Sequence, residues 1–233
     1  MYGKQSEYLQ KKIFNHRTIA IVVSGLFFII VFYILEHFRE IISPKGYLIV
    51  LPLIPLVVLL NFLGNRSLDK SSSYSRGQRG EGAIWYELKA LPDEYCVFQD
   101  IKMNGGGNID FVVLGQTGLF AIEVKSHSGE VTFNGRELEV NNRPFEKDIL
   151  KQAKGEALFV NNYLKNKLQR DIFVQPVGVL SGNATMHFGL KPVNGVYVIQ
   201  KNFLQKLMVA GPQRFSTEEV SRINDELKVL VTG

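Results

Sequence analysis

Two acidic residues and a lysine lie at the adjoining ends of two apolar segments. Asp110 is near the start of segment 109–114, and Glu123 and Lys125 are at the end of segment 119–125. The tetrapeptide between the segments, Gly-Gln-Thr-Gly, is typical of a tight turn that joins two strands of a β-hairpin. A turn centred on the middle of this tetrapeptide places Asp110 directly opposite Glu123. Opposed residues project from the same face, with about 4.5–5.5 Å between their Cβ atoms.

Opposed carboxylates at this spacing indicate metal chemistry. They repel each other unless a cation lies between them, and Mg²⁺ and Mn²⁺ prefer oxygen ligands. Such an ion lowers the pKa of water and neutralises the charge that develops during phosphodiester hydrolysis. We expect Asp110 and Glu123 to be ligands, with the Val124 carbonyl as a third. Lys125 lies on the same side of its strand as Glu123, where it can orient the attacking water or stabilise negative charge. The alternative is a ladder of opposite charges at a surface strand end.

Further candidates lie on other predicted elements. Glu81 is on a helix predicted over 78–91 and joins the site, at a second ion, if that helix packs its N-terminal end there. Gln152 is on a long amphipathic helix predicted over 145–168. His127 is a candidate second base or simply a solvent-exposed loop residue. Three lysines on the long helix share a face and are either phosphate contacts or a solvated surface: Lys147, Lys151 and Lys154.

The two segments that carry the acidic pair are apolar on both faces, which predicts strands of a sheet that is covered on both sides. The spacing of Ser216 and Glu219 predicts a capping box at the start of a helix. The expected elements after residue 77 form a mixed α/β order. They are helices 78–91, 145–168, 202–209 and 216–231, strands 95–101, 109–114, 119–125, 173–180 and 196–199, and a small hairpin of 130–133 with 137–140.

The charge of the chain is unevenly distributed. The net charge is +5 over 233 residues, but ten Lys and Arg against four Asp and Glu precede Gly80, and 17 against 18 follow it. The basic pI therefore does not indicate a DNA-binding domain. Two bound Mg²⁺ ions would make the net charge of residues 80–233 positive and would favour a polyanionic ligand. The single Cys96 excludes an internal disulfide and a thiolate zinc cluster, which fits a reducing compartment.

Residues 1–63 are predicted to be a membrane anchor. Segments 18–35 and 47–63 carry no charge and are close to the length that crosses a bilayer, so we expect a hairpin of two transmembrane helices. A cleaved signal peptide is the alternative for the first segment, but no small-x-small cleavage site follows it. Lys and Arg are more frequent outside the hairpin than in its connecting loop, which predicts that both termini and the soluble domain face the cytoplasm.

Residues 64–79 are rich in Ser, Gly and charge, and this composition predicts a flexible linker. Residues 80–233 are then the soluble domain. At about 150 residues, such a domain buries an adequate core without disulfides.

The ordered set of polar motifs resembles the nuclease-related domain family, NERD, which is grouped with the PD-(D/E)XK nucleases. The motifs that carry the resemblance are Gly80-Glu81, Asn108-Ile109-Asp110, Ile122-Glu123-Val124-Lys125 and Gln152-Ala153, and it covers roughly residues 76–180. It implies a restriction-endonuclease-like mixed central sheet flanked by helices. It also implies that the site residues are Glu81, Asp110, Glu123, Lys125 and Gln152. Ile109 replaces the proline of the superfamily name, and the approach to Gln152 over residues 144–151 is longer than usual.

The sequence therefore predicts a membrane-anchored protein with a Mg²⁺- or Mn²⁺-dependent nuclease-like domain that hydrolyses DNA or RNA. Two other readings stay open at this point. One is a non-catalytic, membrane-tethered nucleic-acid-binding or adapter module with the same fold. The other is a membrane scaffold in which the helical hairpin is the functional part.

Overall fold

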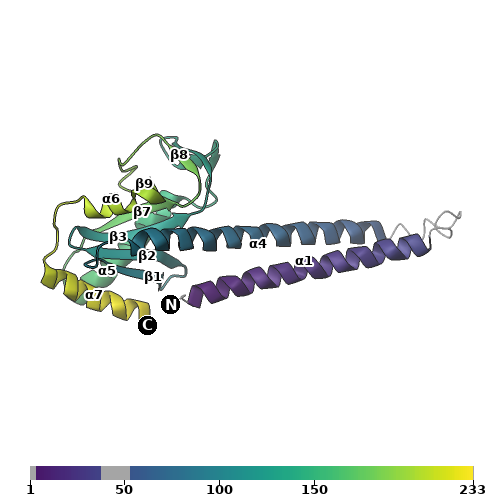
Figure 1. Cartoon of the computed structure of the whole chain (residues 1–233), viewed down its shortest axis with the longest axis horizontal. Helices are drawn as coiled ribbons and strands as arrows, with labels where there is room; N and C mark the ends of the chain where they lie inside the picture. The colour runs from purple at the N-terminus through teal and green to yellow at the C-terminus, as the bar shows by residue number, and fades with distance from the viewer. Residues whose placement is uncertain (1–3, 38–52, 233) are drawn as a thin grey trace. The chain divides into compact units, whose positions relative to one another are not determined.

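The chain folds into two compact units, residues 1–78 and 79–233. The structure is a computed structural model that describes residues 4–37 and 53–232 (Figure 1). The two units are connected through a single long helix, α4 (Leu53–Lys89), and each unit is described by itself.

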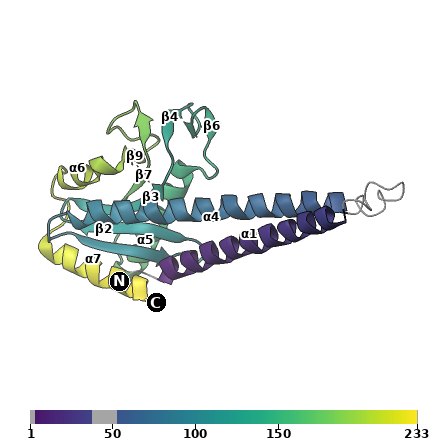
Figure 2. The same ribbon diagram turned by 45° about the vertical axis from the view of Figure 1, so that its right-hand side comes forward.

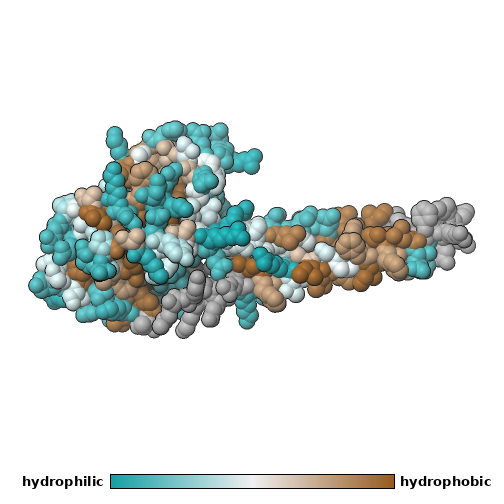
Figure 3. All heavy atoms as spheres, viewed as in Figure 1, coloured by the Kyte–Doolittle hydropathy of each residue, from teal (hydrophilic) through white to brown (hydrophobic). Residues whose placement is uncertain are grey.

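The first unit consists of α1 (Lys4–Glu36) and the N-terminal part of α4, which lie side by side (Figure 1). The Ser67 hydroxyl donates to the His16 carbonyl at 2.9 Å, and the His16 ring stacks on Tyr74 with 5.9 Å between centroids. Hydrophobic residues cover much of the surface of these helices (Figure 3), including the exposed Phe28 and Phe32. Such a surface is suited to an apolar medium.

Within the described ranges, one segment is long and apolar enough to cross a membrane, residues Ile13–Glu36 of α1. The second predicted span, 47–63, begins at residues that lie outside those ranges, and its described part forms the start of α4. Length and composition therefore support one candidate span.

The prediction of a flexible linker over residues 64–79 is wrong, because this segment is helical and lies within α4. Serine lowers helix propensity by competing for backbone hydrogen bonds. Here a serine side chain bonds the backbone without breaking the helix, since the Ser75 hydroxyl donates to the Ser71 carbonyl one turn earlier at 2.9 Å. Ser67 and Ser71 are also buried within the first unit. Tertiary packing overrides a composition that is weak in intrinsic helix propensity.

The second unit contains a five-stranded mixed sheet in the order β1-β2-β3-β7-β9. The strands β1, β2 and β3 are antiparallel neighbours, whereas β3, β7 and β9 run parallel. A smaller sheet has the order β6-β5-β4-β8. The strands are β1 (Cys96–Lys102), β2 (Asn108–Gly115), β3 (Gly118–Lys125), β4 (Gly129–Phe133), β5 (Leu138–Val140), β6 (Arg143–Pro144), β7 (Val174–Leu180), β8 (Ala184–Met186) and β9 (Tyr197–Gln200).

The predicted register of the central hairpin is confirmed. Phe111 pairs with Ile122, and the pairing continues to Gly115 and Gly118 at the turn. The pairing ends at Phe111 and Ile122, and Asp110 and Glu123 are the next residues on the two strands. The two-residue turn fixes the register of such a hairpin, because a slip by one residue would turn every buried side chain to the opposite face.

Helices cover both faces of the large sheet, as predicted (Figure 2). On one face, α5 (Ile149–Leu168) and α7 (Thr217–Thr232) pack over alternate residues of β2 and β3, such as Val112 and Ala121. On the other face, the C-terminal part of α4 and α6 (Leu204–Val209) pack over the intervening residues, such as Phe111 and Ile122. The short helix η1 (Lys201–Phe203) precedes α6. The second unit is therefore a mixed α/β domain, as the order of elements predicts.

The helix ends show where local sequence decides the structure. The capping box of α7 is present, since the Ser216 amide donates to Glu219 at 2.8 Å and the Glu219 amide donates to the Ser216 hydroxyl at 3.2 Å. The long helix α5 begins at Ile149 and not at the predicted residue 145, because Asp148 caps it. The Asp148 carboxylate accepts from the amides of the second and third helical residues at 2.9 and 3.1 Å. Strands β6 and β8 were not predicted.

Candidate active site

Three of the predicted site residues meet in one hydrogen-bonded group. The Lys125 ammonium donates to Glu123 Oε1 on the same strand and to Gln152 Oε1 on α5 at 3.1 Å. Glu123 is only 3 % exposed, and the ammonium of the partly buried Lys125 balances its charge at close range. The longer approach to Gln152 does not displace this residue, because the Asp148 cap starts α5 one turn before it.

Asp110 joins this group through the backbone of the neighbouring strand. Its Oδ2 accepts from the Val124 amide at 2.8 Å, and the side chain is partly buried. Burial is the main cause that raises the pKa of Asp110 well above its ordinary value, and the charges of Glu123 and Glu81 raise it further. The hydrogen bond from the Val124 amide and the positive charge of Lys125 oppose this rise. Asp110 and Glu123 are thus close enough to repel each other.

Glu81 reaches the same carboxylates from the helix on the opposite face of the sheet. Burial raises the pKa of Glu81 to about 7, and the charges of Asp100 and Glu123 contribute to this rise. The preceding Gly80 allows the close approach of α4, because a Cβ at this position would lie 2.6 Å from Ser181 Oγ and 3.1 Å from the Cβ of Ser126. These two serines follow the ends of β7 and β3. The helix therefore brings Glu81 to the end of the sheet where the other acids lie.

A second glycine sets the position of α5. Gly178 of β7 pairs with Glu123 of β3, and paired residues of neighbouring strands point to the same face. A Cβ on Gly178 would lie 2.7 Å from Cγ2 of Ile149, the first residue of α5. The first turn of α5 can therefore rest directly on β7, beside Glu123, and this contact positions Gln152.

The structure adds Glu156, which was not predicted. It lies one turn after Gln152 on α5 and is 1 % exposed, and the Gln152 side-chain amide donates to its Oε1 at 3.1 Å. Burial, followed by the charge of Glu123, raises the pKa of Glu156 to about 10. Glu156 is therefore neutral at pH 7. A signal was present in the sequence, since Glu156 interrupts an apolar helix face that includes Ala153 and Val160.

The structure also adds Asp100, near the end of β1. The neighbouring pairs Gln99 with Phe111 and Ile101 with Ile109 put Asp100 opposite Asp110. Its backbone is left-handed, with φ 60°, which is uncommon for a residue other than glycine. Burial raises its pKa, and its charge in turn raises the pKa of Glu81. Asp100 thus belongs to the same acidic group.

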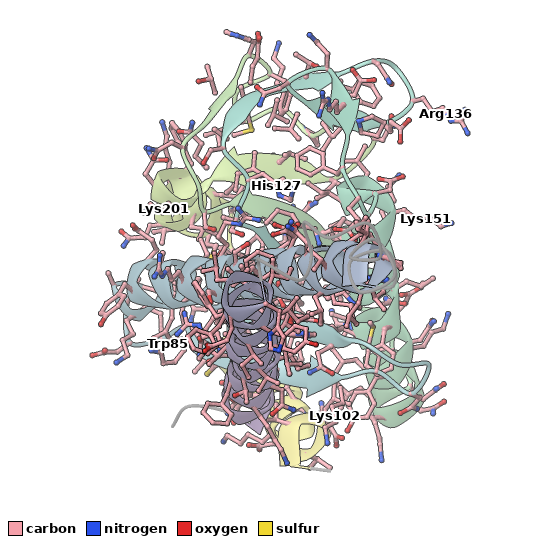
Figure 4. All side chains as sticks on the ribbon, turned by 90° about the vertical axis from the view of Figure 1, so that its right-hand side faces the viewer. Trp85, Lys102, His127, Arg136, Lys151 and Lys201 are labelled. Carbon is pink, nitrogen blue, oxygen red and sulfur yellow. The ribbon has the colours of Figure 1, made fainter. Side chains whose placement is uncertain are left out.

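The other predicted residues lie around this group. The His127 ring packs edge-on against Phe145 with 4.8 Å between centroids, which is a packing contact at the small sheet. Lys147, Lys151 and Lys154 were predicted to share a helix face, but Lys147 precedes the Asp148 cap and lies outside α5. All three are exposed, and Figure 4 shows Lys151 extending outward. Lys151 and Lys154 form a solvated face of α5 that is accessible to a ligand.

The acidic group has the chemistry of a magnesium or manganese site. Its oxygens are hard ligands, the carboxylates repel one another, and Glu123 Oε2 is buried without a hydrogen-bond partner among the described residues. Across residues 4–37 and 53–232, however, no three His, Cys, Asp or Glu side chains are placed to hold one ion together. Mg²⁺ commonly binds through one or two carboxylates and completes its shell with water and substrate phosphate oxygens. The residues present fit that mode of binding.

Glu81 gives this site a measurable dependence of stability on pH. Because the folded state holds the Glu81 proton more tightly than the unfolded state, Glu81 lowers stability as pH rises from about 4.5 to about 7. The shift corresponds to about 3 kcal/mol at full burial, and partial exposure reduces this to about 2 kcal/mol. In metal-free buffer we expect Glu81→Gln to be more stable than the wild type by about that amount at pH 8 and equally stable at pH 4. Chemical unfolding at both pH values measures the difference, and equal stability at pH 8 would contradict it.

Comparison with known proteins supports the family resemblance that the sequence motifs indicate. Residues 76–181 match the sequence model of the family described as the nuclease-related domain, NERD. No curated protein matches the chain at a significant level.

A solved structure with detectable similarity is the small subunit of the heterodimeric restriction endonuclease R.BspD6I. It is 15 % identical, the match covers 69 % of this chain and 80 % of that chain, and the TM-score is 0.28. The family match covers the elements that carry Glu81, Asp110, Glu123, Lys125 and Gln152. The predicted resemblance is therefore confirmed: residues 76–181 match the nuclease-related domain.

Proposed function

We propose that the chain is a membrane-anchored, divalent-metal-dependent nuclease-like protein that hydrolyses phosphodiester bonds in DNA or RNA. The observation that carries this proposal is the meeting of Glu123, Lys125 and Gln152, with Asp110 and Glu81 in electrostatic contact. The nuclease-related domain supports nucleic acid as the ligand. A restriction-endonuclease-like core is the finer description of the fold that we propose.

Each side chain has a distinct role in this reaction. Mg²⁺ or Mn²⁺ held here would lower the pKa of water and neutralise charge on the phosphate. Asp110 and Glu123 would hold the ion, with the Val124 carbonyl as a further oxygen ligand, and Glu81 would bind it or a second ion. Lys125 would stabilise negative charge that develops on the phosphate, which is most effective where water is excluded. Gln152 orients Lys125 through its side-chain oxygen.

The membrane part of the proposal is supported by the apolar α1 helix. We propose two spans, 18–35 and 47–63, with both termini and the nuclease-like domain in the cytoplasm, because Lys and Arg are concentrated on that side. Protease treatment of sealed and opened spheroplasts tests this orientation. Cleavage of the domain in sealed spheroplasts would contradict it.

The direct test of the activity is a cleavage assay on the full-length chain in detergent micelles. Single- and double-stranded DNA and RNA oligonucleotides, labelled at one end, are incubated with Mg²⁺, Mn²⁺ or EDTA. We expect metal-dependent products and no products in EDTA. A Glu123→Gln preparation, purified in parallel, controls for contaminating nucleases.

The same assay separates this proposal from the alternative of a non-catalytic adapter module. One observation favours the adapter. The Lys125 ammonium already neutralises the charge of Glu123, so this carboxylate has a counter-charge without an ion. The adapter predicts oligonucleotide binding without product at every Mg²⁺ and Mn²⁺ concentration, and that result would overturn the nuclease proposal. Deletion of residues 80–233 tests the scaffold reading, which predicts that the anchor alone still recruits partner proteins.

A further inference from the structure

A carboxyl group is buried on the apolar face of α5, although burying an acid is costly unless hydrogen bonds satisfy it. Glu156 is 1 % exposed and lies between the buried residues Ala153 and Val160. Bulk water therefore does not reach its side chain. Its contacts are with Gln152 and Glu123, both of which also contact Lys125.

The Gln152 amide is engaged at both of its polar atoms. Its Oε1 accepts from the Lys125 ammonium at 3.1 Å, and its Nε2 donates to Glu156 Oε1 at 3.1 Å. A side-chain amide has one acceptor end and one donor end, so its two partners decide which way it faces. If the amide turned over, its NH₂ group would point at the ammonium and its oxygen at the Glu156 oxygen. The contact with the ammonium would then be lost.

We propose that Glu156 is a positioning residue for Lys125, because it holds the Gln152 amide with its oxygen toward the Lys125 ammonium. This inference deepens the proposed nuclease function and rests on it for its catalytic meaning. Glu156 does not touch the reacting atoms. It acts through Gln152, and the hydrogen-bonded relay runs from Glu156 to Gln152 to Lys125.

The relay requires residue 156, one turn after Gln152, to offer a hydrogen-bond acceptor to the Gln152 amide. Glutamine at this position has the same shape and keeps a carbonyl oxygen for the Gln152 Nε2. Its NH₂ group can also donate toward Glu123, whose charge contributes to the raised pKa of Glu156. Leucine fills the space but offers no acceptor. The pair Glu156→Gln and Glu156→Leu therefore separates hydrogen bonding from packing.

The test uses full-length chain in detergent micelles and two independent readouts. The first is the rate of cleavage of a labelled oligonucleotide with Mn²⁺. We expect Glu156→Leu to lower kcat by about 10–100-fold, the usual effect of losing a group that orients a site residue, with KM nearly unchanged. Glu156→Gln is expected to restore most of the rate.

The second readout is independent of catalysis. Reductive methylation of Lys125, followed by peptide mass spectrometry in EDTA, reports how firmly the ammonium is held. We expect methylation to be several-fold faster in Glu156→Leu than in the wild type, and unchanged in Glu156→Gln. Gln152→Met should accelerate it as much as Glu156→Leu does, and the double variant should add nothing further, because both changes break one relay.

Asn161→Ala is the matched control for general damage to α5. The Asn161 side chain donates to Asp171 and to the Ile172 carbonyl at 2.7 and 2.6 Å, so its loss weakens the helix anchorage away from the site. We expect lower stability with wild-type kcat and wild-type Lys125 methylation.

Each outcome decides between the relay and its alternatives. Wild-type methylation and kcat in Glu156→Leu would overturn the inference, and so would a Glu156→Gln variant as impaired as Glu156→Leu. If Glu156→Leu does not fold, Gln152→Met together with Glu156→Gln still tests the relay. If the wild type cleaves nothing, the proposed nuclease function fails, while the methylation rates still decide whether Glu156 holds Lys125.

Discussion

Asp110→Asn is expected to reduce metal-dependent cleavage by at least about 100-fold, the scale on which loss of one group that stabilises charge slows an enzyme. Asparagine keeps an oxygen that can accept from the Val124 amide, so the contact between β2 and β3 is preserved. What is lost is the negative charge that attracts a cation. Initial rates of oligonucleotide cleavage over a range of Mn²⁺ concentrations measure the effect.

The same substitution should make the metal-free protein more stable. In the wild type, burial and the charges of Glu123 and Glu81 raise the pKa of Asp110, which means that its ionised form is unfavourable in the folded state. Asp171→Asn is the matched control, because Asp171 is an exposed acid outside the site. Metal-dependent cleavage at the wild-type rate in Asp110→Asn would contradict the assignment of Asp110.

The largest expected effect on stability comes from Lys125. Lys125→Met leaves Glu123, which is 3 % exposed, without the ammonium that balances it. Breaking a buried ion pair from one side costs about 3 kcal/mol or more, since the remaining charge has lost its partner. We expect this loss at pH 8 in EDTA, together with loss of cleavage. Unfolding is followed through the single tryptophan, Trp85, whose ring lies 6.4 Å from that of Phe111 in the core of the second unit.

The double variant Glu123→Gln with Lys125→Met gives the decisive comparison. It removes both charges, so most of the stability lost in Lys125→Met should return. It should still not cleave, because the Glu123 carboxylate that would bind the metal and the Lys125 ammonium are both gone. Equal stability of the single and double variants would mean that the ion pair between Lys125 and Glu123 contributes nothing to the fold.

The acidic residues of this site are expected to lower the stability of the metal-free domain and to be required for cleavage. Several acids are held near one another with raised pKa values, at a cost to the metal-free fold. Natural proteins retain such costs mainly at functional sites. Removing Glu81 or Asp110 should therefore stabilise the domain in EDTA while impairing cleavage, which is the opposite of what a purely structural ion network predicts.

Local sequence determined the central hairpin and its register, in which Asp110 and Glu123 directly follow the last pair of β2 and β3. A two-residue turn between two apolar segments allows few registers, and the buried faces of both strands select one of them. The capping box of α7 was also predictable, because the residues that form it are only three positions apart. The order of polar motifs was sufficient to recognise the nuclease-related domain.

Tertiary structure decided the features that depend on contacts between distant segments. The segment 64–79 is helical although its composition predicts a linker, because its serines are satisfied within the helix and packed inside the first unit. Glu156 is visible in the sequence only as an acid on an apolar helix face, and its contacts form only when the fold places α5 directly on Gly178 of β7. Asp100 joins the acidic group only through the pairing of β1 with β2.

The sequence alone thus determined the register of the central hairpin, because turn geometry and side-chain periodicity act over a few neighbouring positions. The tertiary structure decided how these elements are brought together, with Glu81 from one face of the sheet and Gln152 and Glu156 from the other. It also decided their electrostatics, because burial is the main cause of the raised pKa values and exists only after the helices have packed on the sheet.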